Sequence, residues 1–90
     1  MPLKSALDLL THDLGITRKL REYDVITLWR TIVGDQIARV AVAERVENRV
    51  LFVAVSSAPW RAELSMRRQE ILEKINTAVG RQVIREIRFR

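Results

Sequence analysis

The sequence predicts an α+β domain in which N-terminal helices are followed by a β-hairpin, a long helix and a third strand. Three observations support this. Apolar residues recur with helical spacing up to about residue 38, they alternate with a period of two between residues 40 and 55, and both patterns then return in the same order. This order gives a three-stranded sheet with helices over one face. A chain of 90 residues has room for one core, so we expect a single domain over residues 1–90.

The N-terminal half should form several helices separated by glycine and capping residues. The first helix should end at Gly15 and should bury Leu3, Ala6, Leu7, Leu10 and Leu14. Thr17 can cap a short basic turn, and Asp24 can cap a second helix that ends at Gly34. That second helix should bury Val25, Leu28, Trp29 and Ile32. Asp35 should then start one more turn.

A β-hairpin is predicted between residues 40 and 55. Its first strand is indicated by the alternation of Val40, Val42 and Val46 with small or charged residues, and its second by the β-prone run 50–55. Asn48 tolerates a positive φ, but Arg49 is a poor second residue for a tight turn, so we expect a loop longer than two residues. The pattern does not indicate which strand is central.

The longest helix should end at Gly80, with Pro59 in its first turn and Ser56 and Ser57 as capping candidates. Its apolar stripe consists of Trp60, Leu64, Ile71, Leu72, Ile75 and Val79. Residues 82–90 alternate again and should form the third strand, with Val83, Ile87 and Phe89 on one side. If strands two and three are parallel, the crossover between them should be right-handed.

The composition gives no support to catalytic or metal chemistry. There is no cysteine, the single histidine is His12, and the three glycines are isolated, so neither a metal site nor a phosphate loop is expected. Ser56 and Ser57 lack a plausible general base and are better explained as helix caps. No segment has the length of a membrane span and no leader is evident. We therefore expect a cytoplasmic protein that is not an enzyme and uses no cofactor.

The positive charge is concentrated in the second half of the chain. Residues 1–45 contain seven Lys and Arg against six carboxylates, whereas residues 46–90 contain nine against five. Most of these cations are arginines, which grip phosphate bidentately, so a nucleic acid is a natural partner. The predicted nucleic-acid-binding residues are Arg61, Arg67, Arg68, Lys74, Arg81, Arg85, Arg88 and Arg90. The alternative is a solvated face whose charge is incidental.

Aromatic residues that could stack on unpaired bases are scarce. The residues Trp29, Trp60, Phe52 and Phe89 all fall on apolar stripes and are expected in the core. Tyr23 alone is expected to be free to stack on a base.

Several segments taken together resemble the DciA family of bacterial proteins. They are Leu28-Trp29, Ile32-Val33-Gly34, Ile37-Ala38, Val55-Ser56-Ser57, Trp60, Glu63-Leu64 and Ile87-Arg88-Phe89-Arg90. The resemblance spans nearly the whole chain. It implies a KH-like domain that binds DNA and works with the DnaB-type replicative helicase during helicase loading. The sequence departs from ordinary KH domains in lacking a Gly-x-x-Gly loop, and from longer family members in lacking their flexible tail.

From the resemblance and the charge together we expect a DNA-binding accessory of the replicative helicase that prefers single-stranded or forked DNA. Two alternatives remain open at this point. One is an RNA-binding KH-like module, and the other is a protein-interaction domain that associates through a sheet edge and binds no nucleic acid.

Overall fold

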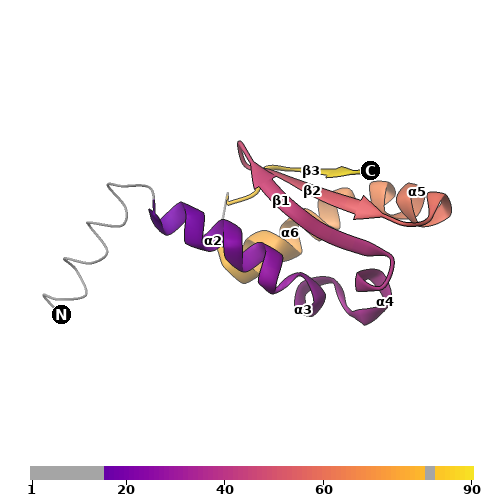
Figure 1. The fold of residues 1–90 in the computed structure, drawn as a ribbon, viewed down its shortest axis with the longest axis horizontal. Coiled ribbons are helices and arrows are strands. Elements are labelled where there is room, and N and C mark those ends of the chain that lie inside the picture. Colours follow the sequence, from indigo (N-terminus) through magenta and orange to yellow (C-terminus); the bar gives the residue numbers. More distant parts are fainter. Residues whose placement is uncertain (1–15, 81–82) are drawn as a thin grey trace, which may run out of the picture.

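The protein is an α+β domain, as predicted. The computed structural model describes residues 16–80 and 83–90 (Figure 1). The first predicted helix and Arg81 lie outside the described residues. The elements are α2 (Ile16–Thr27), α3 (Trp29–Val33), α4 (Asp35–Ala38), β1 (Ala41–Glu47), β2 (Val50–Val55), α5 (Ala58–Met66), α6 (Arg68–Val79) and β3 (Glu86–Phe89).

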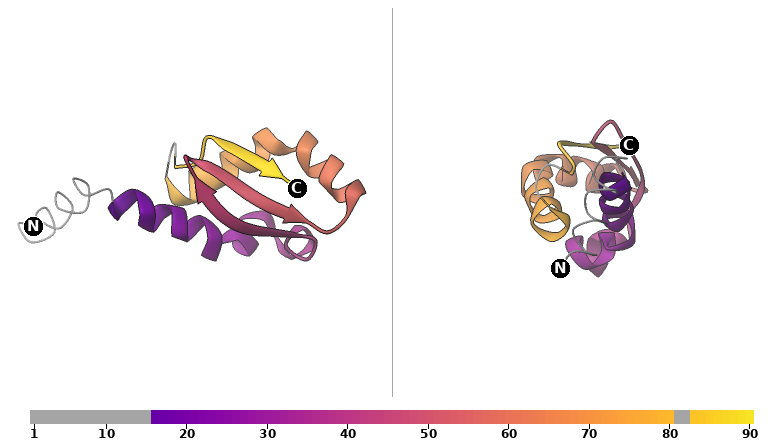
Figure 2. Two further views of the ribbon diagram at one scale, coloured as in Figure 1. Left: turned by 45° about the horizontal axis from the view of Figure 1, so that its top comes forward. Right: turned by 90° about the vertical axis from the view of Figure 1, so that its left-hand side faces the viewer.

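The three strands form one mixed sheet in the order β1-β2-β3, so β2 is the central strand. β1 pairs with β2 antiparallel, and β3 pairs with β2 in parallel. The helices gather on one side of the sheet, which Figure 2 shows most clearly in its right-hand view. Burial along β2 agrees, because Leu51, Val53 and Val55 are buried whereas Phe52 and Ala54 on the other face are partly exposed. We call this second face the open face of the sheet.

The hydrophobic core lies between the sheet and the helices. Its largest fully buried side chains are Leu51, Leu64, Ile71, Ile75, Ile84, Ile87, Val25 and Val53. Trp29 joins α3 to this core, and its indole Nε1 donates a 2.9 Å hydrogen bond to the carbonyl of Ala41 at the start of β1. Since a buried indole N–H needs a partner, this bond fixes the angle at which the N-terminal helices meet the sheet.

The hairpin turn differs from the sequence prediction. Glu47 pairs with Val50, so the loop contains only Asn48 and Arg49, and the expectation of a longer loop was wrong. Both residues have positive φ, 51° and 64°, which is the backbone of a two-residue turn that matches the twist of the strands. Arg49 therefore occupies a position that usually requires glycine.

The alternation in β1 does not produce one apolar face. The register of the hairpin shifts between Ala43 and Arg45, so Glu44 is an additional residue in β1, a β-bulge. Ala41 and Ala43 are buried, Val42 is 58% exposed, and Val46 after the bulge packs on the core. Val42 and Val46 thus lie on opposite faces of the sheet. The additional residue in the bulge moves every later side chain of the strand to the other face.

Two helix boundaries also differ from prediction. Asp24 lies inside α2 and does not cap a helix, and the chain breaks at Leu28, which is 40% exposed and not buried as predicted. The long helix is interrupted at Arg67, which has φ −97° and ψ 11° and separates α5 from α6. Ser57 caps α5 as expected, since its Oγ accepts a 3.3 Å hydrogen bond from the N–H of Trp60.

Candidate nucleic-acid interface

The open face of the sheet carries a row of three side chains across its centre. Because Phe52 pairs with Arg45 on β1 and with Arg88 on β3, it lies between two arginines. The Arg45 guanidinium lies over the Phe52 ring, 4.2 Å from its centroid. The expectation that Phe52 belongs to the core was therefore wrong. Its ring instead makes a cation–π contact with Arg45, because a cation is attracted to an aromatic face.

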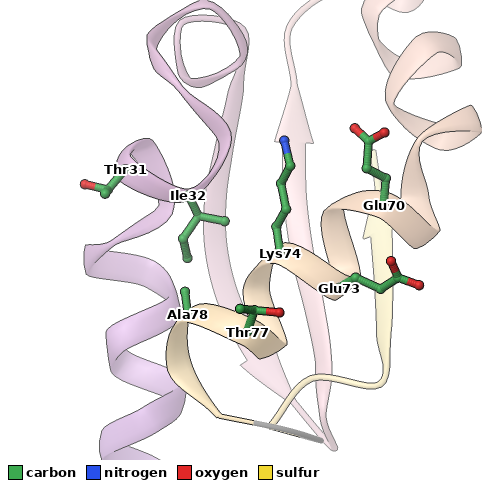
Figure 3. Close-up of a pocket in the computed structure, with 7 residues that line it drawn as sticks. All are labelled: Thr31, Ile32, Glu70, Glu73, Lys74, Thr77 and Ala78. Carbon is green, nitrogen blue, oxygen red and sulfur yellow. The ribbon is translucent and has the colours of Figure 1, made fainter.

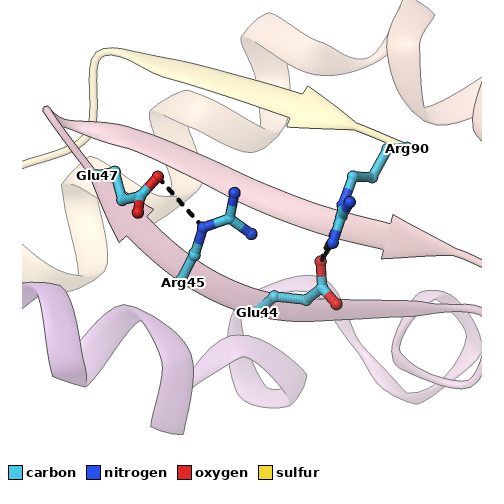
Figure 4. Close-up of polar contacts among 4 residues, drawn as sticks. All are labelled: Glu44, Arg45, Glu47 and Arg90. Carbon is cyan, nitrogen blue, oxygen red and sulfur yellow. Dashed lines mark hydrogen bonds and ion pairs between the residues drawn. The ribbon is translucent and has the colours of Figure 1, made fainter.

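Each arginine of the open face has a carboxylate partner. Arg45 pairs with Glu47 and Arg88 with Glu86, both at 3.2 Å, and Arg90 pairs with Glu44 at 2.8 Å. Figure 4 shows two of these pairs, with Arg90 and Glu44 meeting over β2. All of these groups are exposed enough for the pairs to exchange with other ions. Three positive charges on this face are thus balanced by three negative ones.

The predicted cations of the long helix are distributed differently. Arg67 bonds to Glu63 at 2.8 Å across one helical turn. Arg61 is half-buried, and its Nη2 donates to the carbonyl of Val55 at 3.3 Å. The Arg68 guanidinium lies 5.9 Å from the centroid of the Phe89 ring, so it reaches the β3 side of the domain. These three side chains lie on the helical side of the sheet. Arg88 and Arg90 lie on the opposite, open face.

Lys74 lies in a groove between α3 and α6 (Figure 3). The groove has a volume of about 530 Å³ and is lined by Thr31, Ile32, Glu70, Glu73, Lys74, Thr77 and Ala78. Its lining is mostly apolar, and two carboxylates outnumber one ammonium. Within the groove, the two carboxylates therefore offset the positive charge of Lys74.

Further arginines come from the end of the domain that carries the hairpin turn. Arg85, immediately before β3, donates its backbone N–H to the carbonyl of Arg49 at 2.9 Å. The Arg21 guanidinium from α2 lies against Gly80 at the end of α6. Sequence reasoning included Arg85 but missed Arg21 and Arg49. The asparagine and arginine at the turn were the available signal, because Arg replaces the glycine that such a turn favours.

The aromatic residues otherwise behave largely as expected. Trp29 is buried, and Trp60 and Phe89 pack against the core. Tyr23 on α2 is 65% exposed, so its ring is accessible. Among the residues that the structure describes, no group of three metal-binding side chains occurs, and none of the helices is both long and apolar enough to cross a bilayer.

Comparison with known proteins identifies the family. Residues 2–89 match the sequence model of the family described as Dna[CI] antecedent, DciA. The chain belongs to the DciA family.

Several mycobacterial and related proteins are similar to this DciA-family chain. A UPF0232 protein of Mycolicibacterium smegmatis is 35% identical over 87 residues, which cover 92% of this chain and 45% of the relative. One from Mycobacterium tuberculosis is 32% identical over 88 residues, covering 98% of this chain and 47% of the relative. One from Rhodococcus jostii is 30% identical with the same coverage. The chain thus spans slightly less than half the length of these curated relatives.

Proposed function

We propose that this DciA-family chain is a non-enzymatic, DNA-binding accessory of the DnaB-type replicative helicase. The main support is the family match over residues 2–89. The formal net charge of +5, supplied mostly by arginine, is the second support, because a polyanion is attracted to such a surface. In this proposal the domain binds DNA without sequence preference and contacts the helicase through other parts of its surface. The KH-like character of the fold is part of the same proposal.

The cations predicted from the sequence are proposed contacts with the DNA backbone. Arg68, Lys74 and Arg85 are exposed, and none of them pairs with a carboxylate within 4.0 Å among the described residues. Arg67, Arg88 and Arg90 would have to exchange a carboxylate for a phosphate before they bound DNA. Such an exchange costs little, since exposed ion pairs contribute only about 0.2–1 kcal/mol. Arg61 and Arg81 complete the proposed set.

A titration of the purified protein tests this function. Labelled single-stranded DNA, duplex, forked DNA and RNA are compared at two salt concentrations. Binding that is tightest for single-stranded or forked DNA and weakens steeply with salt is the expected result. Tighter binding to RNA would favour an RNA-binding module instead. Absence of binding at low salt would leave a protein-interaction domain.

Co-precipitation with the DnaB-type helicase tests the second half of the proposal. The tagged protein should retain purified helicase from the same organism, with and without DNA. Loss of the complex after nuclease treatment would show that DNA alone bridges the two proteins. Failure to retain the helicase under either condition would contradict the proposed partnership.

A further inference from the structure

The end of the domain that carries the hairpin turn is rich in arginine. The β1–β2 turn, the end of α6, part of α2 and the segment leading into β3 all lie at this end in Figure 1 and in the left-hand view of Figure 2. Three exposed arginines come from these segments, namely Arg21, Arg49 and Arg85, and we call them the hairpin-end arginines. Each comes from a different element, so only the fold brings them to this end.

Arg49 and Arg85 are neighbours through their backbones. The 2.9 Å hydrogen bond from the Arg85 N–H to the Arg49 carbonyl extends the β2–β3 ladder one residue beyond the pair Val50 and Glu86. Adjacent residues of a parallel ladder are about 4.8 Å apart. The backbones of the two arginines are therefore adjacent, which puts two like charges on neighbouring positions of the sheet.

Arg21 is held at the same end by its packing on Gly80. A Cβ atom built on Gly80 would collide with the Arg21 guanidinium, so this side chain lies directly over the glycine. Gly80 follows the last residue of α6, where the carbonyl groups of a helix carry partial negative charge. That charge helps to hold the guanidinium, while the absence of a side chain on Gly80 makes room for it.

No carboxylate neutralises the hairpin-end arginines within the part of the chain that the structure describes. None of the three has a carboxylate oxygen within 4.0 Å. The acidic residues nearest to them in sequence have other partners. Glu22, next to Arg21, pairs with Lys19 at 3.8 Å, Glu47 pairs with Arg45, and Glu86 pairs with Arg88. This contrasts with the open face, where every arginine is paired.

The backbone of Arg49 is an independent reason to expect a function at this end. Its φ of 64° lies in the left-handed region, which disfavours residues with a Cβ atom. Glycine would fit the backbone of the turn better, so the turn itself does not require arginine at this position. Strained backbone of this kind is concentrated at binding and catalytic sites.

We propose that Arg21, Arg49 and Arg85 form a phosphate-binding site for the backbone of a single nucleic-acid strand. This inference rests on the proposed function and specifies where the strand is bound. Three guanidinium groups can each bond a phosphate oxygen, and they need not first release a carboxylate. The site would be insensitive to base sequence, because it contacts only the backbone.

The decisive experiment compares two triple variants that remove the same charge. One carries Arg21→Gln, Arg49→Gln and Arg85→Gln, and the other, the control variant, carries Arg30→Gln, Arg39→Gln and Arg45→Gln, three exposed arginines outside the proposed contacts. Affinity for a labelled oligothymidylate of about 20 nucleotides, longer than the site of one small domain, is measured by fluorescence anisotropy at several salt concentrations. The hairpin-end variant should bind at least about tenfold more weakly, with a salt slope smaller in magnitude by about 2. The control variant should lose less than about threefold.

Three outcomes separate the inference from the proposed function. Equal or greater loss in the control variant would overturn the hairpin-end site while leaving DNA binding intact. An unchanged affinity in the hairpin-end variant would do the same. Absence of binding by the unaltered protein at low salt would contradict the proposed function and the site together.

A second variant distinguishes lost contacts from lost structure. Arg49→Gly should bind the oligothymidylate about threefold or more weakly while its melting temperature stays the same or rises, because glycine relieves the positive φ. Unchanged affinity in this variant would remove Arg49 from the site.

Discussion

The guanidinium of Arg90 reaches over the central strand to the carboxylate of Glu44, with Nε at 3.1 Å and Nη2 at 2.8 Å from Oε1. Arg90 follows β3 and Glu44 is the bulge residue of β1, so the pair links both edges of the sheet across its open face. Arg90 is also one of the proposed DNA contacts. Glu44 therefore competes with phosphate for the same guanidinium.

Replacing Glu44 with Gln should release Arg90 and strengthen DNA binding if Arg90 contacts the backbone. The gain should be up to about fivefold, since an exposed ion pair is worth about 0.2–1 kcal/mol. Anisotropy titration with single-stranded DNA measures it. Glu73→Gln on α6 is the matched control, because it removes the same charge on the helical side of the sheet, where Glu73 lines the groove between α3 and α6. Equal gains in both variants would mean that net charge alone is responsible and would argue against a contact by Arg90.

Trp29→Phe should destabilise the domain by about 1–3 kcal/mol in urea unfolding. Phenylalanine cannot donate the hydrogen bond to the Ala41 carbonyl, and a smaller ring leaves space in a closely packed region. Trp60→Phe is the control, because Trp60 is only half-buried. The variant at position 60 should lose clearly less stability. Similar losses at both positions would show that ring volume, and not the hydrogen bond, dominates.

The order of the elements could be predicted because it depends on local patterns. Each of these patterns involves only residues that are close in sequence. Examples are the helical spacing, the β-prone run 50–55 and the helix end at Gly80. The bulge at Glu44 could not be predicted, because it depends on how β1 pairs with β2. Its consequence is that the side chains of β1 after Glu44 point to the other face of the sheet. The central position of β2 likewise depends on contacts between distant segments.

The charges of the site were visible in the sequence, but their partners were not. Glu44 and Arg90 are 46 positions apart, and only the sheet brings them together. Arg21 meets Gly80, and Arg49 meets Arg85, through the same kind of long-range packing. Composition thus predicted a basic protein, whereas the division between paired and unpaired arginines required the fold.

Asn76→Ala should destabilise the domain by about 2 kcal/mol and loosen β3. The Asn76 side chain donates to the Ile84 carbonyl at 2.9 Å and accepts from the Ile84 N–H at 3.2 Å, which ties α6 to the segment before β3. Ile84 is fully buried, so both of its backbone groups would lose their partner. Urea unfolding and amide hydrogen exchange of β3 measure the effect. Thr77→Ala, at the exposed neighbouring position, should change stability by less than about 0.5 kcal/mol. Unchanged exchange in β3 would show that the strand does not depend on this tie.

Arg49→Gly should stabilise the fold although it removes a proposed binding residue. Left-handed backbone costs a residue with a Cβ atom about 1–2 kcal/mol, whereas glycine loses about 0.5–1 kcal/mol more conformational entropy on folding. The difference predicts a net gain of up to about 1 kcal/mol in the free energy of unfolding, measured by urea titration.

Asn48→Gly is the matched control for the turn. Asn48 has a similar φ of 51°, but asparagine tolerates the left-handed region, so its gain should be smaller. Lower stability of Arg49→Gly would mean that the arginine side chain supports the turn. In that case arginine at position 49 would be explained by stability, and its positive φ would no longer indicate a binding role.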